Sequence, residues 1–454
     1  MLLPYNPTKR PIMKLPLLIS FFVLQVNLLF SQSTVNYSFS NVTNASLTNM
    51  STGATDLLIP TSVTGDFASG VVPIGFDYWL MGTRYSDFSV NSNGLMRLGK
   101  TAVTTAFSNT AANSATNSAS LYAFWDDLNS YSTSSTSRVR YKLTGSAPNR
   151  VLTVEWKDFI ISYNSATTTQ LSTWQIRIYE TTGVFQYVYG SMQIATGAST
   201  VTASIGMTYA NSNNNLIFLT SISAPAVSRT AGSFVTNLVN SNTVGNIANL
   251  NSASNGSRVM YTFTPQLPSG PPTGLTFSAI GTSAMTLNWT NATTNEVGYV
   301  VYRSDDGGVT YYFASQTAAN ATTSVQSALS PATTYFWKVY AVTEGALSSS
   351  LNGSQATTSC GAGPYPTNTL TYTGSGAAVN WSSAAWSLGH SPTACENAVI
   401  NFNRTNNGTA TYIVTLNVPA TVYNLTINGA YGGNGQKLLQ LNTGSNSLTV
   451  LGNL

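Results

Sequence analysis

The chain has few charged residues, one histidine and two cysteines, and each scarcity excludes classes of function. Charged residues make up 7% of the 454 residues, against roughly 25% in typical soluble proteins. The lysines and arginines form no cluster, whereas nucleic-acid binding needs clustered cations that displace counterions. We therefore predict that nucleic acid is not a partner.

The sequence also lacks a recognisable catalytic motif. His390, the one histidine, lies in the sequence SLGHSP, without a GxSxG nucleophile elbow or an HExxH partner. Glu155 and Glu180 each follow a strand-like segment, and a glycosidase pair would require them about 5 to 10 Å apart. Isolated acids on an extracellular sheet are usually solvated, which is the interpretation that we favour. We predict that the chain is not an enzyme.

One group of oxygen ligands is a candidate metal site. Asp126, Asp127 and Asn129 in FWDDLNS carry the hard oxygen ligands that Ca²⁺ prefers. The alternative is a strand end whose acids cap a turn and face water. Asp305 and Asp306 in RSDDGG are more typical of a hairpin turn. We expect no cofactor other than calcium at this candidate site.

The two cysteines are Cys360 and Cys395. A disulfide between them is favoured over free thiols or a metal pair, because no further cysteine or clustered histidine exists. It would close a loop of about 35 residues and stabilise that region by roughly 4 kcal/mol on the chain-entropy model. Such a bond is typical of an oxidising, exported location.

The amino-terminal sequence is typical of a secretory signal peptide. An apolar run at 15–30 ends in the small and polar SQS, and basic residues precede it: Lys9, Arg10 and Lys14. We expect cleavage after Ser31, with Met1 or Met13 as the start, which lowers the formal net charge from +4 to +1. An uncleaved membrane anchor is the alternative, although the run is short and holds two polar side chains. We predict a secreted or outer-surface protein with no transmembrane segment in the mature chain.

Residues 36–265 show short strands separated by turn signals. In TWQIRIYE, Trp174, Ile176 and Ile178 share one face, as in a half-buried strand. Many short strands at this spacing predict an all-β sandwich. Sheets that pack about 10 Å apart need bulky side chains between them, so we expect the rings of residues 71–98 to lie mostly in the core, with an exposed platform as the alternative: Phe76, Trp79, Tyr85 and Phe88.

This region also resembles a known module. IGFDYWLMGTRYSDFSVNSNGLMRLG, then AFWDDL, NRVLTVEW, WQIRIYETTGVFQYVYG and ASIGM, resembles a β-sandwich module of secreted bacterial surface proteins. It is distantly similar to the nidogen-type extracellular domain, with the order F-x-x-x-G, F, N-G, L and W-D-D. The resemblance covers about half of the chain and implies an architecture more than a ligand.

After a proline- and glycine-rich linker at 266–271, residues 272–358 resemble a fibronectin type III domain. The resemblance lies in PPTGLTFSAIGTSAMTLNW, GYVVYRS and LSPATTYFWKVYAV. It implies that Trp289 points inward from the second strand and that the Tyr335 hydroxyl ties an inter-strand loop to the backbone. This fold serves mainly as a spacer or adhesion module, and the loop TEGALSSS lacks the Arg-Gly-Asp of integrin ligands.

The last segment, 359–454, contains the two cysteines and a repeat. YIVTLNVPATVYNLTING and LLQLNTGSNSLTVLGNL resemble coils of a right-handed β-helix or a related stacked-strand module, in which each coil buries its face against the next. Because the repeat stops at Leu454, we expect a fragment of a longer protein. Exported proteins of this appearance often end in a sorting tail of the type IX pathway, which this sequence does not contain.

Together the patterns predict an all-β chain of tandem sandwiches, jelly-roll-like and then fibronectin type III, followed by a partial stacked-strand or β-helix-like module. The expected divisions are a signal peptide (1–31), a sandwich (32–265), a linker (266–271), a fibronectin type III domain (272–358) and a β-repeat module (359–454).

We predict an adhesin-like, non-catalytic protein that recognises an extracellular glycan, or a matrix or cell-surface protein, through the amino-terminal sandwich. One alternative is an ancillary part of an exported polysaccharide-degrading or proteolytic enzyme whose catalytic module lies beyond residue 454. A purely structural stalk is a third possibility.

Overall fold

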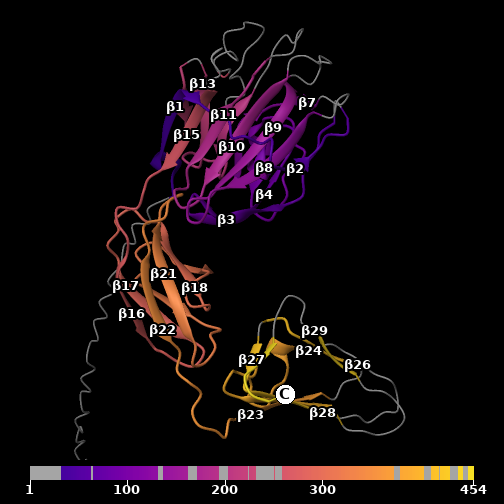
Figure 1. The fold of residues 1–454 in the computed structure, drawn as a ribbon, viewed down its shortest axis with the longest axis vertical. Coiled ribbons are helices and arrows are strands. Elements are labelled where there is room, and N and C mark those ends of the chain that lie inside the picture. The colour runs from indigo at the N-terminus through magenta and orange to yellow at the C-terminus, as the bar shows by residue number, and fades with distance from the viewer. Residues whose placement is uncertain are drawn as a thin grey trace, which may run out of the picture.

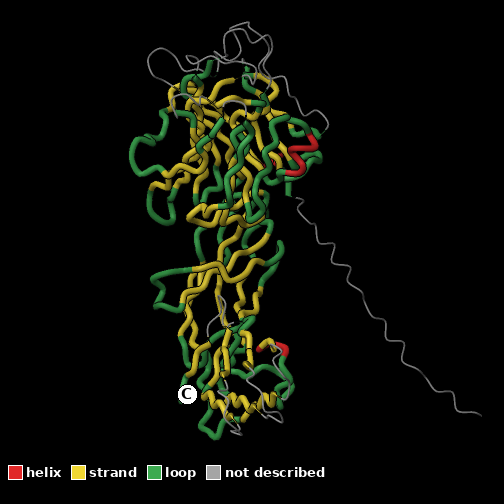
Figure 2. The backbone as a smooth tube through the Cα atoms, turned by 90° about the vertical axis from the view of Figure 1, so that its right-hand side faces the viewer, coloured by secondary structure: helices red, strands yellow, loops and turns green. Residues whose placement is uncertain are grey.

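A computed structural model describes most of the chain after the predicted signal peptide, which lies outside the described residues. The described residues are 32–62, 65–130, 136–161, 171–193, 203–222, 224–231, 250, 258–372, 379–402, 411–418, 420–429, 438–442 and 448–453. They are nearly all β, as predicted. Three parts follow one another along the chain: two antiparallel sandwiches and a set of stacked parallel strands (Figures 1 and 2). Within the described ranges, no helix is long and apolar enough to cross a membrane.

Two antiparallel sheets form the amino-terminal sandwich (Figure 1). One sheet has the order β1 (Tyr37–Ala45), β15 (Arg258–Pro265), β11 (Phe185–Tyr189), β10 (Ser172–Tyr179), β9 (Val151–Ile161), β8 (Arg138–Thr144) and β2 (Thr55–Leu58), with β7 (Leu128–Ser130) beside β9. The other has the order β14 (Ala226–Ser228), β13 (Leu216–Ser221), β12 (Ser204–Thr208), β6 (Ser120–Trp125), β5 (Met96–Leu98), β4 (Thr83–Val90) and β3 (Val72–Leu80). The short helix α1 (Ala111–Thr116) precedes β6.

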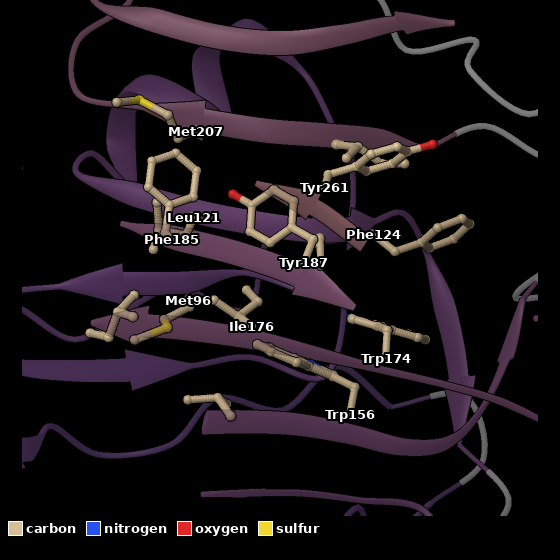
Figure 3. Close-up of a cluster of buried hydrophobic side chains, with 14 of the residues drawn as sticks. Met96, Leu121, Phe124, Trp156, Trp174, Ile176, Phe185, Tyr187, Met207 and Tyr261 are labelled. Carbon is tan, nitrogen blue, oxygen red and sulfur yellow. The ribbon is translucent and has the colours of Figure 1, made fainter. Parts of the chain in front are cut away.

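Aromatic side chains fill the space between these two sheets (Figure 3). Trp156 on β9 and Trp174 on β10 stack with their ring centroids 6.2 Å apart, and Phe124 from the opposite sheet packs 5.6 Å from Trp174. The period-two alternation of β10 places Trp174 and Ile176 in this core. Each such buried side chain contributes about 1.5 to 3 kcal/mol.

A polar turn at residues 91–94 supports the core. The Asn91 side-chain oxygen accepts hydrogen bonds from the backbone amides of Asn93 (3.1 Å) and Leu95 (3.0 Å). Gly94 has φ +97°, and a Cβ there would overlap the carbonyl oxygen of Phe124. The polar residues 91–94 therefore form a structural turn between β4 and β5.

The second sandwich consists of a three-stranded and a four-stranded sheet. Their orders are β16 (Thr273–Ser278), β17 (Met285–Thr290) and β20 (Thr323–Gln326), and β19 (Tyr312–Gln316), β18 (Gly298–Ser304), β21 (Thr334–Val342) and β22 (Leu351–Ala356). Trp289 lies in the core, 4% exposed. The Tyr335 hydroxyl accepts a hydrogen bond of 2.8 Å from the backbone amide of Ser330, which is the geometry of a tyrosine corner.

The third part stacks parallel strands. Its ladders are β23 (Thr367–Tyr372), β25 (Asn397–Phe402) and β28 (Asn424–Gly429); β24 (Val379–Asn380), β26 (Thr411–Thr415) and β29 (Leu438–Asn442); and β27 (Ala420–Val422) and β30 (Leu448–Val450).

Side-chain amides connect successive turns of this stack. Asn424 donates to the side-chain oxygen of Asn397 over 2.7 Å, and Asn428 donates to that of Asn401 over 2.9 Å. Both pairs are register partners in the β25–β28 ladder, so the amides align equivalent positions. A disulfide joins Cys360 to Cys395 beside the first turn, with an S–S distance of 2.04 Å.

Replacing Tyr335 with Phe should lower the free energy of unfolding by about 1 to 2 kcal/mol, because the amide of Ser330 loses its acceptor. Urea denaturation of the full chain measures this loss. Tyr311→Phe is the matched control, because the Tyr311 hydroxyl has no side-chain hydrogen bond among the described residues, and it should change stability by less than about 0.5 kcal/mol. Equal losses in the two variants would contradict a role for the Tyr335 hydroxyl.

Candidate functional site

The amino-terminal sandwich packs directly against the second sandwich through Trp79. This side chain on β3 is 1% exposed, and it lies in a cluster with Val300 and Val342 of the second sandwich. Its ring centroid is 6.4 Å from that of Phe313. Trp79 is therefore buried against a neighbouring domain, whereas Phe76 and Phe88 belong to the core of their own sandwich and Tyr85 is only partly buried.

Glu344 supplies most of the polar contacts across this interface. It is 2% exposed, and its side-chain oxygen accepts hydrogen bonds from the Asn36 amide group (2.7 Å) and the Ser33 backbone amide (3.3 Å). Its carbonyl oxygen accepts from the Gly82 amide (2.9 Å) and the Tyr37 hydroxyl (3.2 Å). Glu344 thus connects the second sandwich to both sheets of the first, through the start of β1 and through the turn between β3 and β4.

The two backbones also touch. The Leu347 amide donates to the Thr181 carbonyl oxygen over 2.9 Å. Gly183 follows in the same turn with φ +63°, and a Cβ there would overlap the carbonyl oxygen of Gly345. The linker is tied to the second sandwich as well, since the Thr343 hydroxyl donates to the Gln266 carbonyl oxygen over 2.6 Å.

A cleft of about 750 Å³ opens beside this interface, and both sandwiches line it. Six of its nineteen lining residues are aromatic and five are charged, against 11% and 7% of the whole chain. The aromatic residues are Phe76, Tyr302, Tyr311, Tyr312, Phe313 and Tyr340, and the charged residues are Asp77, Arg84, Arg150, Glu180 and Lys338. The cleft is therefore enriched in aromatic and in charged residues relative to the whole chain.

Arg84 and Asp77 form one ion pair in the cleft, with an N–O distance of 2.6 Å. The Arg84 guanidinium also lies 4.4 Å from the ring centroid of Phe313. The Tyr302 hydroxyl donates to the second oxygen of Asp77 over 2.7 Å. Burial, and then the charge of Asp77, raise the pKa of Tyr302 well above its ordinary value, so this hydroxyl keeps its proton and remains a donor.

Arg150 and Glu180 form a second, bidentate pair. The Arg150 Nη2–Glu180 Oε1 distance is 2.6 Å and the Arg150 Nε–Glu180 Oε2 distance is 2.8 Å. The hydrogen bond to Glu180 raises the pKa of the Arg150 guanidinium above its ordinary value. Two parallel hydrogen bonds between a guanidinium group and a carboxylate hold both side chains in one orientation.

Lys338 is the third cation of the cleft. Its ammonium group lies 4.0 Å from the ring centroid of Tyr311. Among the described residues, no carboxylate lies within salt-bridge distance of it. Tyr312 is 40% exposed and lies at the edge of the cleft. Arg303 lies 5.1 Å from its ring centroid and donates a hydrogen bond of 2.8 Å to its hydroxyl, which donates in turn to Asp305 over 3.0 Å.

The two glutamates that the sequence singled out lie far apart. Glu155 is register partner of Gln175 on β10, and Glu180 lies five residues further along, which is roughly 17 Å at the rise of a strand. Glu155 is bound to Arg140 (2.7 Å) and accepts from Gln175 (2.8 Å). This separation does not fit a glycosidase pair. His390 lies in an exposed loop, where Nδ1 is 2.9 Å from the Ser391 carbonyl oxygen.

The candidate calcium ligands lie where the chain crosses between the sheets of the first sandwich. Asp126 and Asp127 connect β6 in one sheet to β7 in the other, and Asn129 is buried on β7. Burial, and then the charge of Asp66, raise the pKa of Asp127. In the described ranges, no three His, Cys, Asp or Glu side chains are placed to hold a metal ion. The calcium site stays a prediction.

Replacing Gly183 with Ala should loosen the contact between the sandwiches, because the new Cβ would overlap backbone of the second sandwich. We expect faster proteolysis at the linker, 266–271, and a larger radius of gyration in small-angle scattering. Gly307→Ala is the matched control: Gly307 also has a left-handed φ, +82°, but open space around its Cβ position. Both variants carry backbone strain of roughly 1 to 2 kcal/mol. Only the amount by which the effect of Gly183→Ala exceeds that of Gly307→Ala can therefore be attributed to the interface. Identical behaviour of the two variants would contradict a close-packed interface.

Comparisons with known proteins agree with the two sandwiches. Residues 36–265 match the family model described as NIDO related, and residues 270–354 match the fibronectin type III domain. No curated protein sequence matches the chain.

Similar solved structures each cover 20% of this chain. The fibronectin type III domain of human collagen XX is 26% identical, with 93% of that chain covered and a TM-score of 0.18. FN3tt is 26% identical, with 96% covered and a TM-score of 0.18. A computationally redesigned β-sandwich protein is 17% identical, with 94% covered and a TM-score of 0.19. Because the NIDO-related model spans residues 36–265, just over half of the 454 residues, the chain belongs to the NIDO-related family and carries a fibronectin type III domain after that module.

Proposed function

We propose that this protein is an adhesin-like, non-catalytic extracellular binding protein that holds a glycan or matrix ligand in the cleft between its NIDO-related and fibronectin type III domains. The proposal rests on the size and the lining residues of this cleft. Its volume of about 750 Å³ falls within the range of small-molecule sites, which combine apolar walls with a few oriented polar groups.

The aromatic walls favour a sugar as the ligand. Tyrosine offers an apolar ring face together with a hydroxyl that forms hydrogen bonds, and a sugar ring likewise presents an apolar C–H face edged by hydroxyls. Tyr302 and Tyr340 line the cleft from adjacent strands with ring centroids 5.7 Å apart. The fibronectin type III domain would therefore form part of the site, in addition to the amino-terminal sandwich that the sequence favoured.

The carboxylates of the cleft support binding over catalysis. General acid–base work needs a carboxyl group within reach of substrate and free to exchange a proton. Asp77 and Glu180 each already accept hydrogen bonds from an arginine, so their carboxylate oxygens are engaged within the protein. They would orient arginine side chains toward a ligand.

The domain composition supports a location outside the cell. The disulfide between Cys360 and Cys395 is of a kind that persists in oxidising compartments, and the fibronectin type III domain is common in extracellular proteins. The predicted signal peptide would direct export. The parallel ladders after β23 fit coils of a β-helix, which would present the two sandwiches away from an anchoring surface.

Replacing Tyr311 and Tyr312 together with Ala should weaken ligand binding by roughly tenfold or more, because two aromatic contacts are lost. Glycan arrays, immobilised matrix proteins and cell attachment, all with the full chain, measure the effect. Phe107→Ala is the matched control, since Phe107 is 47% exposed and does not line the cleft. Binding unchanged in the double variant would exclude the cleft as the site. A wild-type chain that binds no glycan, matrix protein or cell would overturn the proposed function.

A further inference from the structure

We infer that the ligand of this cleft is an acidic saccharide that places one carboxylate on the ammonium group of Lys338. The inference rests on the proposed function and adds the chemical class of the ligand. It follows from the charges of the cleft, from the position of Lys338, and from the way in which the other ionic groups are already paired.

The charges of the cleft leave one cation in excess. Arg84 is paired with Asp77, and Arg150 with Glu180, so these four side chains are neutral together. Lys338 has only the ring of Tyr311 against its ammonium group among the described residues. The hydroxyls of a neutral sugar could accept hydrogen bonds from this ammonium group, but they would leave its charge without a counter-charge in the covered cleft, which is less favourable than a charge pair. A ligand with one carboxylate would neutralise it.

The position of Lys338 fits this role. Lys338 is register partner of Tyr302 in the β18–β21 ladder, and Lys338 and Tyr340 share one face of β21 because side chains alternate along a strand. The two tyrosine rings and the ammonium group therefore lie side by side on the sheet surface that lines the cleft. A sugar ring against the tyrosines would hold its ring substituents within reach of Lys338.

The paired arginines set an upper limit on the charge of the ligand. A densely sulfated chain would need several free cations, and it could recruit Arg84 or Arg150 only by breaking bonds of 2.6 Å to their carboxylates. Leaving those carboxylates unpaired in a covered cleft would be unfavourable. One carboxylate, as in a uronic or sialic acid residue, matches the single free cation.

The test uses an array of uronate- and sialate-containing oligosaccharides beside their methyl esters, which keep the sugar skeleton and lose the charge. The full chain should bind the acids roughly fivefold to tenfold more tightly than the esters at low salt, as expected for one charge pair. The preference should shrink as salt rises. Lys338→Gln should abolish the preference, because binding of the acids weakens more than binding of the esters, whereas Lys100→Gln, at an exposed lysine outside the cleft, should keep it.

The outcomes separate this inference from the proposed function. Equal binding of acids and esters, or a preference for sulfated glycans, would overturn the acidic-saccharide inference and leave a glycan-binding cleft. A preference for acids that survives Lys338→Gln would overturn the role of Lys338. Binding to a matrix protein alone would also overturn the inference, and no binding to any of these probes would overturn both.

Discussion

Burial of Trp79 between the two sandwiches is the contact on which the cleft depends. The walls of the cleft come from different domains, which would move independently if only a short linker joined them. Burying one large aromatic side chain contributes about 2 to 3 kcal/mol, and the hydrogen bonds around Glu344 fix the angle at which the domains meet. The fibronectin type III domain thereby forms one wall of the cleft.

Because charged residues are scarce elsewhere in the chain, the few that line the cleft dominate its electrostatic environment. In a chain with 7% charged residues, five such residues in one cleft define a local electrostatic environment with little interference from the rest of the surface. The two ion pairs hold Arg84 and Arg150 in place before any ligand arrives. Side chains that are already ordered lose less conformational entropy on binding, so the pairs would favour selective recognition of the ligand that we propose.

The sequence predicted the all-β fold class and the two kinds of module far better than the cleft. Period-two alternation predicts a strand such as β10 whether or not its partners are known. The sequence LSPATTYFWKVYAV, which contains Tyr335, indicated the tyrosine corner that the structure shows. The same alternation could not tell that Trp79 is buried against another domain. Glu344 and Asn36 are 308 residues apart, and no local pattern links them. Three consecutive rings at 311–313 were the one local sign of the cleft.

The lateral contacts between the sandwiches also have a mechanical consequence. Tension applied from the carboxyl-terminal side would reach the first sandwich through the bonds of Glu344 and Leu347 as well as through the covalent linker. These bonds lie side by side and would share a load, instead of opening one after another. Pulling on the chain would thus load the two domains together, and the cleft between them would keep its shape until the contacts between the domains broke.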